Sequence, residues 1–317
     1  MSGAQDAAFQ ALVRQGNQAR FAGDAATAEQ AYRAALKLRP DNAPVMANLG
    51  LLLLSVGRYA EGWPLYEARK LIHQPDVPPP PLPEWQGEPL TGKSLLVWAE
   101  QGLGDEIQMA RFIAPLKAMG ARVTLACSPP LARLFKGLKV PVLAITPQLK
   151  APRADFQVLL MSLPARLGLT LETLSAAPYL TAPSAPRAGG TGFVWRGNPQ
   201  HPNDAARSLP SPEILAPLAA HTELVDLQTP QGDFLDTARR IQALDRVITV
   251  DTAMAHLAGA LGVPCWVMLP AHWTDWRWLR GRDDSPWYGS VRLWRQQAAG
   301  DWDGVVARMG EELGTTP

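Results

Sequence analysis

The sequence of 317 residues has few cysteines and almost no net charge: its two cysteines are Cys127 and Cys265, and its formal charge is +1. Cysteine and histidine do not occur at the spacing of a zinc site, so we expect no metal site. Each cysteine adjoins an apolar run, where it is expected to be a small buried side chain in a reducing compartment. A charge near zero gives no basic surface for nucleic acid or anionic lipid, and neither partner is expected.

Long apolar runs are absent too. No stretch approaches the roughly 18 residues of a membrane span, and the N-terminal MSGAQDAAFQALVRQ lacks the basic and apolar regions of a secretory signal. We therefore expect a cytoplasmic protein without a transmembrane segment. With 47% hydrophobic and 19% charged residues, the composition is that of a soluble globular protein, and the length favours about two or three domains.

The first part of the chain, residues 1–73, contains an internal repeat. Five positions recur at one fixed interval, so that Gly16, Gly23, Ala28, Tyr32 and Ala35 correspond to Gly50, Gly57, Gly62, Tyr66 and Arg69. The interval matches the roughly 34-residue period of tetratricopeptide repeats, helix pairs with small residues where the two helices cross. About two such repeats are predicted, and we expect them to dock onto the residues that follow, because so short an array is rarely stable alone.

Residues 74–92 are rich in proline, with five prolines among the six positions 78–83. Proline cannot continue a helix or a central strand, so this segment is predicted to be a stiff, extended connector. The alternative is a proline-rich ligand for another protein.

From residue 93 onward, apolar strands alternate with helices. Strands are predicted at 94–98, 121–127, 140–145 and 156–162, and then at 192–195, 223–227, 246–250, 265–269 and 291–294. Helices are predicted at about 103–119, 131–138, 212–220, 233–244, 252–261 and 301–313. A Pro/Gly/Ala-rich linker at 181–191 separates the two series. The pattern predicts two Rossmann-like α/β domains with parallel sheets, residues 93–182 and 192–317, and a ligand cleft between their carboxyl edges.

The turn after the first of these strands, within EQGLGDEIQMARF (100–112), has two glycines and an acidic residue. A dinucleotide fingerprint would need a small residue at 107 and an acidic end to the second strand, but the sequence has Ile107 and Cys127-Ser128. No phosphate-loop sequence is present either. What remains is a turn, formed by Gln101, Gly102 and Gly104, that brings backbone amides and the Asp105 carboxylate to the mouth of the cleft. From its position alone, Asp105 is either a helix cap or a functional group of the cleft; the resemblance given below implies that it is a base on the acceptor side.

A better anion site is predicted at VITVDTAMAHLAGALG, where a strand turns into a helix of small residues. The free amides and positive dipole end of this helix, at Thr252 and Ala253, suit a phosphate group. Asp251 would cap the helix or accept from a sugar hydroxyl, and Thr252 would donate to phosphate. His256 lies one turn further on the same face and could reach the same ligand, or serve only as a structural hydrogen bonder.

Two loops should face the same cleft. VWRGNPQHPNDAARSLP contains the predicted donor contacts Asn198, Asn203 and Arg207, with Arg207 opening a helix and clamping a diphosphate; a solvated polar loop is the alternative. AHWTDWRWLRGRDDSPWY follows the last predicted buried strand. Its Trp276 and Trp278 would stack on a base or a sugar, or else pack the loop itself.

The combination of EQGLGD, W-x-G-N-P-x-H-x-N-D-x-x-R-S and D-T-A-x-A-H-L-A-G-A-L-G resembles the heptosyltransferase-like glycosyltransferases. More closely, it resembles the bacterial branch that has tetratricopeptide repeats in front. The resemblance implies a GT-B fold, no metal or cofactor requirement, and a nucleotide-sugar donor bound mainly by residues 192–317. It also implies that Asp105 is the base and that Asp251, Thr252 and His256 contact the donor. Arg207 stands where this family usually has lysine.

The expected function is therefore inverting, metal-independent transfer of a sugar from a nucleotide-diphosphate donor to a hydroxyl of a protein or glycan. The helical repeats would hold this acceptor or stabilise the catalytic half. The chemistry agrees, because a sugar nucleotide brings its own leaving group and needs mainly a base and stabilisation of the departing diphosphate. A non-catalytic tetratricopeptide scaffold with a vestigial GT-B half stays open, as does another GT-B reaction such as sugar-nucleotide epimerisation.

Overall fold

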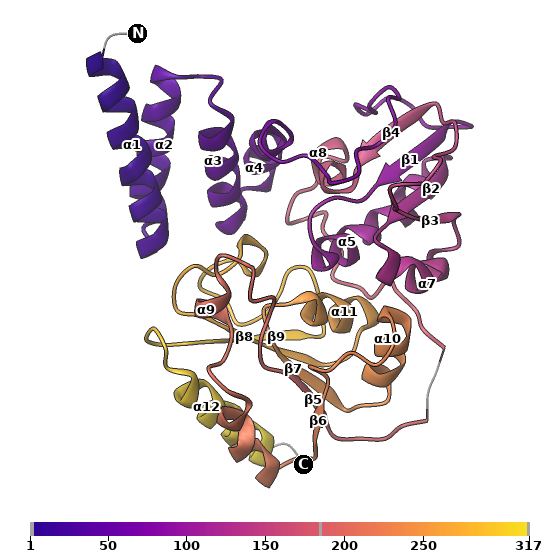
Figure 1. Cartoon of the computed structure of the whole chain (residues 1–317). Coiled ribbons are helices and arrows are strands. Elements are labelled where there is room, and N and C mark those ends of the chain that lie inside the picture. The colour runs from indigo at the N-terminus through magenta and orange to yellow at the C-terminus, as the bar shows by residue number, and fades with distance from the viewer. Residues whose placement is uncertain (1–2, 184–185, 316–317) are drawn as a thin grey trace.

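The computed structural model describes residues 3–183 and 186–315 and consists of an N-terminal helical region followed by two parallel α/β sheets (Figure 1). Six residues lie outside the described ranges: residues 1 and 2 of the expected repeats, Ser184 and Ala185 of the expected linker, and residues 316 and 317 of the expected last domain. Within the described part of the chain, no helix is long and apolar enough to cross a membrane.

The helical region consists of two helix pairs that lie side by side (Figure 1). Its elements are α1 (Gly3–Ala22), α2 (Ala25–Leu38), α3 (Ala43–Ser55), α4 (Tyr59–Tyr66) and the 3-10 helix η1 (Glu67–Leu71). At the first crossing, a Cβ on Gly16 would lie 2.6 Å from the ring of Tyr32. At the second crossing, a Cβ on Gly50 would lie 2.7 Å from the amide nitrogen of Tyr66. Both crossings therefore depend on a glycine, which explains why glycine recurs at this interval.

The first sheet has the strand order β3-β2-β1-β4, and every neighbouring pair is parallel. Its strands are β1 (Ser94–Trp98), β2 (Arg122–Cys127), β3 (Val142–Ala144) and β4 (Phe156–Leu159). Its helical elements are α5 (Leu103–Met109), η2 (Ala110–Phe112), α6 (Ile113–Ala118), η3 (Pro129–Leu131), α7 (Ala132–Phe135), η4 (Lys136–Leu138), η5 (Leu160–Ser162) and α8 (Leu163–Arg166).

Two expectations for this sheet need correction. The strand predicted at 156–162 ends at Leu159, and the amide of Met161 donates to the Glu100 carboxylate (3.2 Å) instead of to a strand. The long helix predicted at 103–119 is interrupted by the 3-10 turn η2. Pro115 explains the interruption, because it has no N–H to donate to the carbonyl four residues earlier.

The second sheet has the order β6-β5-β7-β8-β9 and is also entirely parallel. Its strands are β5 (Thr191–Val194), β6 (Leu224–Asp226), β7 (Arg246–Val250), β8 (Cys265–Leu269) and β9 (Val291–Arg295). Its helical elements are α9 (Asp204–Arg207), the 3-10 helix η6 (Pro212–Ala220), α10 (Phe234–Gln242), α11 (Ala253–Leu261), η7 (Trp276–Trp278) and α12 (Trp302–Thr315).

In each sheet, one central strand has its successor on one side and a later strand on the other. This strand is β1 in the first sheet and β5 in the second. Such a reversal opens a crevice at the carboxyl ends of the strands, where ligands bind in open α/β sheets. Cys127 and Cys265 lie at strand ends and are both buried as free thiols, as predicted.

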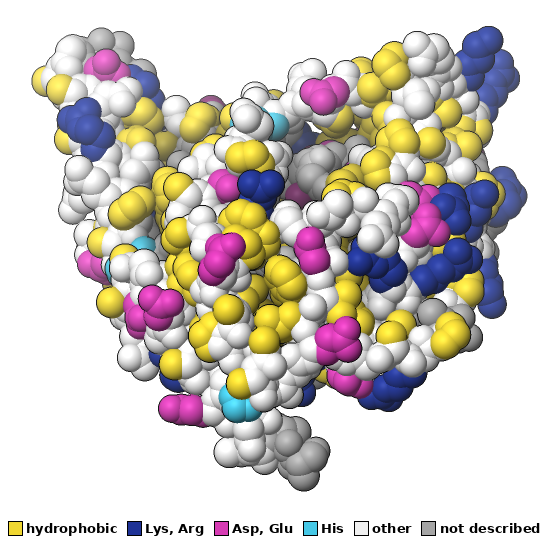
Figure 2. Space-filling view, turned by 60° about the horizontal axis from the view of Figure 1, so that its bottom comes forward, with side chains coloured by type: hydrophobic (Ala, Val, Ile, Leu, Met, Phe, Trp, Pro, Cys, Tyr) yellow, Lys and Arg dark blue, Asp and Glu magenta, His cyan; other side chains and the backbone are white. Residues whose placement is uncertain are grey.

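One continuous hydrophobic core joins the helical region to both sheets. At its centre, Trp63 of α4 packs edge-to-face on Trp276, with ring centroids 5.2 Å apart. Tyr59 of the same helix accepts a hydrogen bond from the indole N–H of Trp287 (2.9 Å). The helical region therefore packs directly against both sheets and shares their core. On the face seen in Figure 2, Lys and Arg side chains gather along the right-hand edge.

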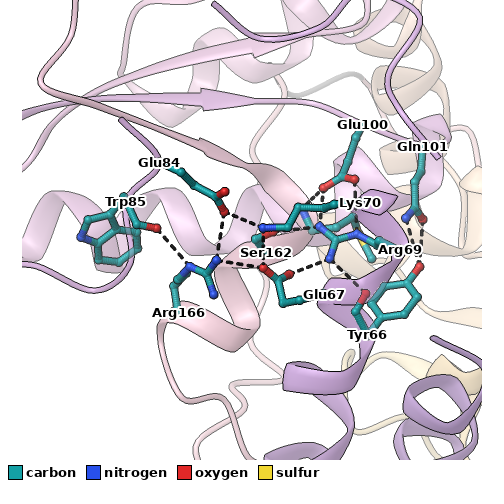
Figure 3. A network of polar contacts seen from close by, with 11 residues as sticks. Tyr66, Glu67, Arg69, Lys70, Glu84, Trp85, Glu100, Gln101, Ser162 and Arg166 are labelled. Carbon is teal, nitrogen blue, oxygen red and sulfur yellow. Dashed lines mark hydrogen bonds and ion pairs between the residues drawn. The ribbon is translucent and has the colours of Figure 1, made fainter. Parts of the chain in front are cut away.

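A buried ion pair fastens the end of the helical region to the first sheet (Figure 3). Arg69, only 2% exposed, contacts both oxygens of Glu100 (2.6 and 3.3 Å) and donates to the hydroxyl of Ser162 (2.9 Å). Its remaining nitrogen pairs with Glu67 (2.6 Å). Glu100 directly precedes the glycine turn, so this ion pair positions the turn against the helices.

The proline-rich connector packs against this junction. Trp85 is fully buried, its amide donates to the carbonyl of Gln157 in β4 (2.8 Å), and Glu84 pairs with Lys70 and Arg166 (2.6 and 2.9 Å; Figure 3). The segment forms no helix and only an isolated bridge, between Glu84 and Gln157. It is attached to the edge of the first sheet and is therefore more than a spacer.

Replacing Arg69 by methionine should lower the free energy of unfolding by about 3–5 kcal/mol, because it leaves the buried Glu100 carboxylate without a cation. The measurement is urea denaturation at neutral pH. The double variant R69M/E100L removes both charges and should recover much of that loss. A single variant as stable as the wild type would contradict this role for the pair.

Candidate functional site

A cavity of about 1150 Å³ lies at the carboxyl ends of both sheets. Most of the residues predicted for the site line it: Gln101, Gly102, Gly104, Asp105, Asn198, Asn203, Arg207, Asp251, Thr252, Ala253, His256 and Trp276. The predicted residue that does not line it is Trp278. The structure therefore gathers side chains from the β1, β5, β7 and β8 loops around one space, which the helical region also borders.

The glycine turn holds two helices in contact. Gly102 is the N-cap of α5, and a Cβ on Gly104 would lie 2.9 Å from the ring of His256 and 3.4 Å from the Cα of Ala253. Gly104 therefore makes room for helix α11, and it also lines the cavity as predicted. Gln101 adopts a left-handed backbone (φ 66°), which is unfavourable for a residue with a side chain. The side-chain amide of Gln101 donates to the Tyr66 hydroxyl (3.0 Å).

Asp105 makes the helix-capping contact that was one alternative for this residue, and its side chain also lines the cavity. One carboxylate oxygen accepts the amide of Gly102 (2.9 Å), which is a capping contact at the start of α5. The other oxygen forms an ion pair with Arg277, and the side chain lines the cavity. Capping and a position facing a ligand are thus compatible here.

Arg277 is the main residue that the sequence analysis missed as part of the site. It is almost fully buried and contacts Asp105, the side-chain oxygen of Gln108 (2.5 Å) and both oxygens of Asp275 (3.0 Å each). Its guanidinium also lies over the ring of Trp276, 4.4 Å from the centroid. In the sequence it appears only as one charge in an aromatic loop, and no local pattern connects it to α5.

The start of α11 has the geometry of an anion site. The Thr252 hydroxyl caps the helix by accepting the amide of Met254 (3.2 Å), and it lies 3.1 Å from the hydroxyl of Thr249. Burial and the negative charge of Asp275 raise the pKa of the adjacent Asp251 to about 7, although the nearby Trp278 indole and Arg207 oppose the rise. Asp251 is thus often protonated near neutral pH, which reduces its repulsion of an anion at the helix end.

His256 is held rigidly at the boundary between α5 and α11. It is 5% exposed, its Nδ1 shares a hydrogen bond with the Tyr288 hydroxyl (2.9 Å), and its ring stacks on Trp278 with centroids 5.4 Å apart. Burial, with the charges of Arg277 and Arg111, holds its pKa well below the usual value. The imidazole is therefore neutral and structurally fixed, while one edge faces the cavity.

The loop after β5 reaches the cavity with three of the predicted contacts. Arg207 is the last residue of the one-turn helix α9 and contacts Asp204 (3.4 Å), so the expectation that it opens a helix is wrong. The chain becomes extended at Ser208, which ends the turn. Asn203 donates to the carbonyl of Trp273 (2.9 Å), while its own buried side-chain oxygen has no partner among the described residues. Asn198 accepts the amide of Gln200 (3.0 Å).

The predicted stacking role of Trp278 is wrong. Its ring is 0% exposed and lies behind His256, because the loop after β8 turns inward and uses its tryptophans to fill the core. Trp276 is also buried, against Trp63, and only its margin lines the cavity. Trp273, which the sequence did not distinguish, is 45% exposed and lines the cavity.

Comparison with known proteins agrees with this fold. No family model matches the chain. Protein FlbA of Caulobacter vibrioides is 26% identical over 321 residues, covering 83% of this chain and 53% of FlbA, so the chain spans about half of that relative's length.

Among solved structures, Escherichia coli ADP-heptose LPS heptosyltransferase II aligns with a TM-score of 0.50 and 14% identity, over 70% of this chain and 97% of that structure. A glycosyl transferase family 9 structure from Veillonella parvula aligns with a TM-score of 0.48 and 10% identity, over 74% and 92%. The likeness to heptosyltransferase II is one of α/β fold with parallel sheets.

The raised pKa of Asp251 predicts a pH-dependent stability. Below pH 3.8, the ordinary pKa of aspartate, this carboxyl is protonated in both the folded and the unfolded protein. Between pH 3.8 and about 7 it ionises in the unfolded protein only. The folded protein therefore loses stability as the pH rises through this range. The variant D251N should therefore gain about 2 kcal/mol relative to the wild type between pH 5.5 and pH 8. Urea denaturation at the two pH values measures this difference. A constant difference would show that Asp251 titrates normally.

Proposed function

We propose that the protein is a GT-B glycosyltransferase that moves a sugar from a nucleotide-diphosphate donor to a hydroxyl acceptor, with inversion and without a metal. Residues 93–182 would form the acceptor-side domain and 192–317 the donor domain, behind tetratricopeptide-like repeats at 1–73. The observation that supports this most strongly is that Asp105 from the first sheet and the α11 N-terminus from the second face one cavity. The fold shared with heptosyltransferase II, whose name gives ADP-heptose as its substrate, adds support.

The donor diphosphate would lie at the start of α11. The free amides there and the helix dipole attract anions, and the Thr252 hydroxyl can donate while it caps the helix. Arg207 and Asn203 line the same cavity, so the Arg207 guanidinium can pair with the diphosphate. A partly protonated Asp251 would complete the site by accepting or donating to the sugar.

Asp105 would accept the proton of the acceptor hydroxyl. As the acceptor oxygen forms its bond to the anomeric carbon, the bond from that carbon to the diphosphate oxygen breaks, and the leaving group takes the electron pair. The proton moves to the Asp105 carboxylate, whose oxygens have lone pairs left beyond Gly102 and Arg277. The base comes from the first sheet and the phosphate site from the second. With the acceptor on the Asp105 side, attack from the face opposite the leaving group would invert the anomeric centre.

Donor binding can be tested by calorimetry with ADP, UDP, GDP and CDP. At least one should bind, and R207Q should weaken it about tenfold or more through the loss of a charge-assisted hydrogen bond. R239Q, which removes an exposed arginine of α10, is the matched control and should bind normally. Affinity should fall as the pH rises through about 7, when Asp251 ionises, and D251N should remove this fall. Absence of binding for every nucleotide would favour the scaffold hypothesis.

The base assignment is tested by D105N, which should slow transfer about 10²- to 10⁴-fold while nucleotide affinity stays unchanged. Turnover is measured as nucleoside diphosphate released from the corresponding nucleotide sugar. E106Q is the control, because this neighbouring buried carboxyl contacts Ser128 and does not line the main cavity. Wild-type turnover in D105N would exclude Asp105 as the base.

A further inference from the structure

The main cavity continues beyond Asp105 along the helical region. We call this part the acceptor arm and define it by Arg20, Leu51 and Tyr66 on the helices and by Trp273 and Arg280 on the loop after β8. Tyr66 marks its inner end, since its hydroxyl bonds to Gln101 of the glycine turn (3.0 Å). The arm therefore leads from the proposed base to the outer surface, between two parts of the chain that are distant in sequence.

The two walls of the arm touch at its outer end. Phe21 of α1 packs edge-to-face on Trp273, with ring centroids 4.8 Å apart, and Arg280 donates to the carbonyl of Gly23. Both aromatic residues are nonetheless about half exposed. Trp273 also has a left-handed backbone (φ 61°), a costly conformation for a bulky residue and one that is concentrated at ligand-binding positions.

Two arginines stand at this outer end without a carboxylate. Arg20 donates to the side-chain oxygen of Asn48 (3.2 Å), and neither Arg20 nor Arg280 forms an ion pair with any residue in the ranges 3–183 and 186–315. Arg33 and Arg58, which also lie in the helical region, both pair with glutamates. Arg280 bonds to the carbonyl of Gly23, close to Arg20 in the chain, and both arginines line the same cavity. In keeping with this proximity, burial and the charge of Arg20 lower the pKa of Arg280. An anion between them would relieve the repulsion between the two cations.

We propose that Arg20 and Arg280 form an anion subsite in the acceptor arm, and that the acceptor carries a carboxylate or phosphate group which they bind. Paired guanidinium groups suit both anions, because each presents several N–H donors in a fixed plane. The role as an acceptor site rests on the proposed function of Asp105, whereas the binding of an anion by the two arginines does not. Because one arginine comes from α1 and the other from the loop after β8, neither half of the molecule forms the subsite alone.

The test is arginine modification of the full chain by phenylglyoxal, with the rate at each arginine followed by peptide mass spectrometry. The probes are inorganic phosphate, acetyl-Glu-Ser-Glu-amide and glucuronic acid, with acetyl-Gln-Ser-Gln-amide as the neutral control. At least one anion should slow modification of Arg20 and Arg280 about fivefold at saturation, as charge-assisted binding requires, while the exposed Arg122 and Arg153 react unchanged. The anion that protects best identifies the source of the charge as phosphate, peptide or acidic sugar.

Unchanged rates at Arg20 and Arg280 with all three anions would overturn the subsite. A parallel sample with nucleoside diphosphate separates this result from the proposed function, because the donor should protect Arg207 whether or not the arm binds anions.

Charge variants provide a second measurement. R20Q/R280Q should weaken the protecting probe about tenfold or more and leave nucleotide affinity intact. R122Q/R153Q, which removes the same charge from exposed positions outside the cavity, should change neither affinity. If both double variants weaken probe binding equally, the loss comes from the change in net charge, and a defined subsite is contradicted.

Discussion

The buried ion pair between Arg69 and Glu100 is the constraint on which the arrangement of the site depends. A desolvated carboxylate at the end of β1 needs a cation, and the helical region supplies it from η1. The same carboxylate accepts the amide of Met161 and so determines where β4 ends. Glu100 thus fixes the relative positions of the helical region, the glycine turn and the sheet edge. Asp105 lies five residues after Glu100, on α5, and the start of α5 is positioned by the same contacts.

Much of the fold follows from local patterns in the sequence. Apolar runs such as SLLVW and CWVML predict buried parallel strands because their neighbours on both faces must be apolar, and the structure contains both as β1 and β8. Since carboxyl ends of parallel strands share an edge, residues as distant as Asp105 and Asp251 could be expected around one space. The helical repeat was visible because Gly16 and Gly50 satisfy the same steric requirement.

The remaining features depend on contacts that no local pattern encodes. Arg277 meets Asp105 across 172 positions of sequence, so its role appears only once both loops are folded. Trp273 and Trp278 are alike in a list of aromatic residues, yet the turn between them sends one into the core and leaves the other at the cavity. Three acidic residues of the cavity, Asp105, Asp251 and Asp275, differ for the same reason. Arg277 pairs with the first and third, while burial raises the pKa of the second to about 7.

The contact at Gly104 has a mechanical consequence. Only a glycine hydrogen separates α5 from the imidazole of His256, and that ring is clamped in turn by Trp278 and Tyr288. With no compressible side chain in between, a displacement of α11 must push α5 with it, because packed interiors transmit strain rather than absorb it. The movements of the two sheets are therefore coupled at this contact. A displacement at the amino end of α11 is transmitted directly to α5, the helix that carries Asp105.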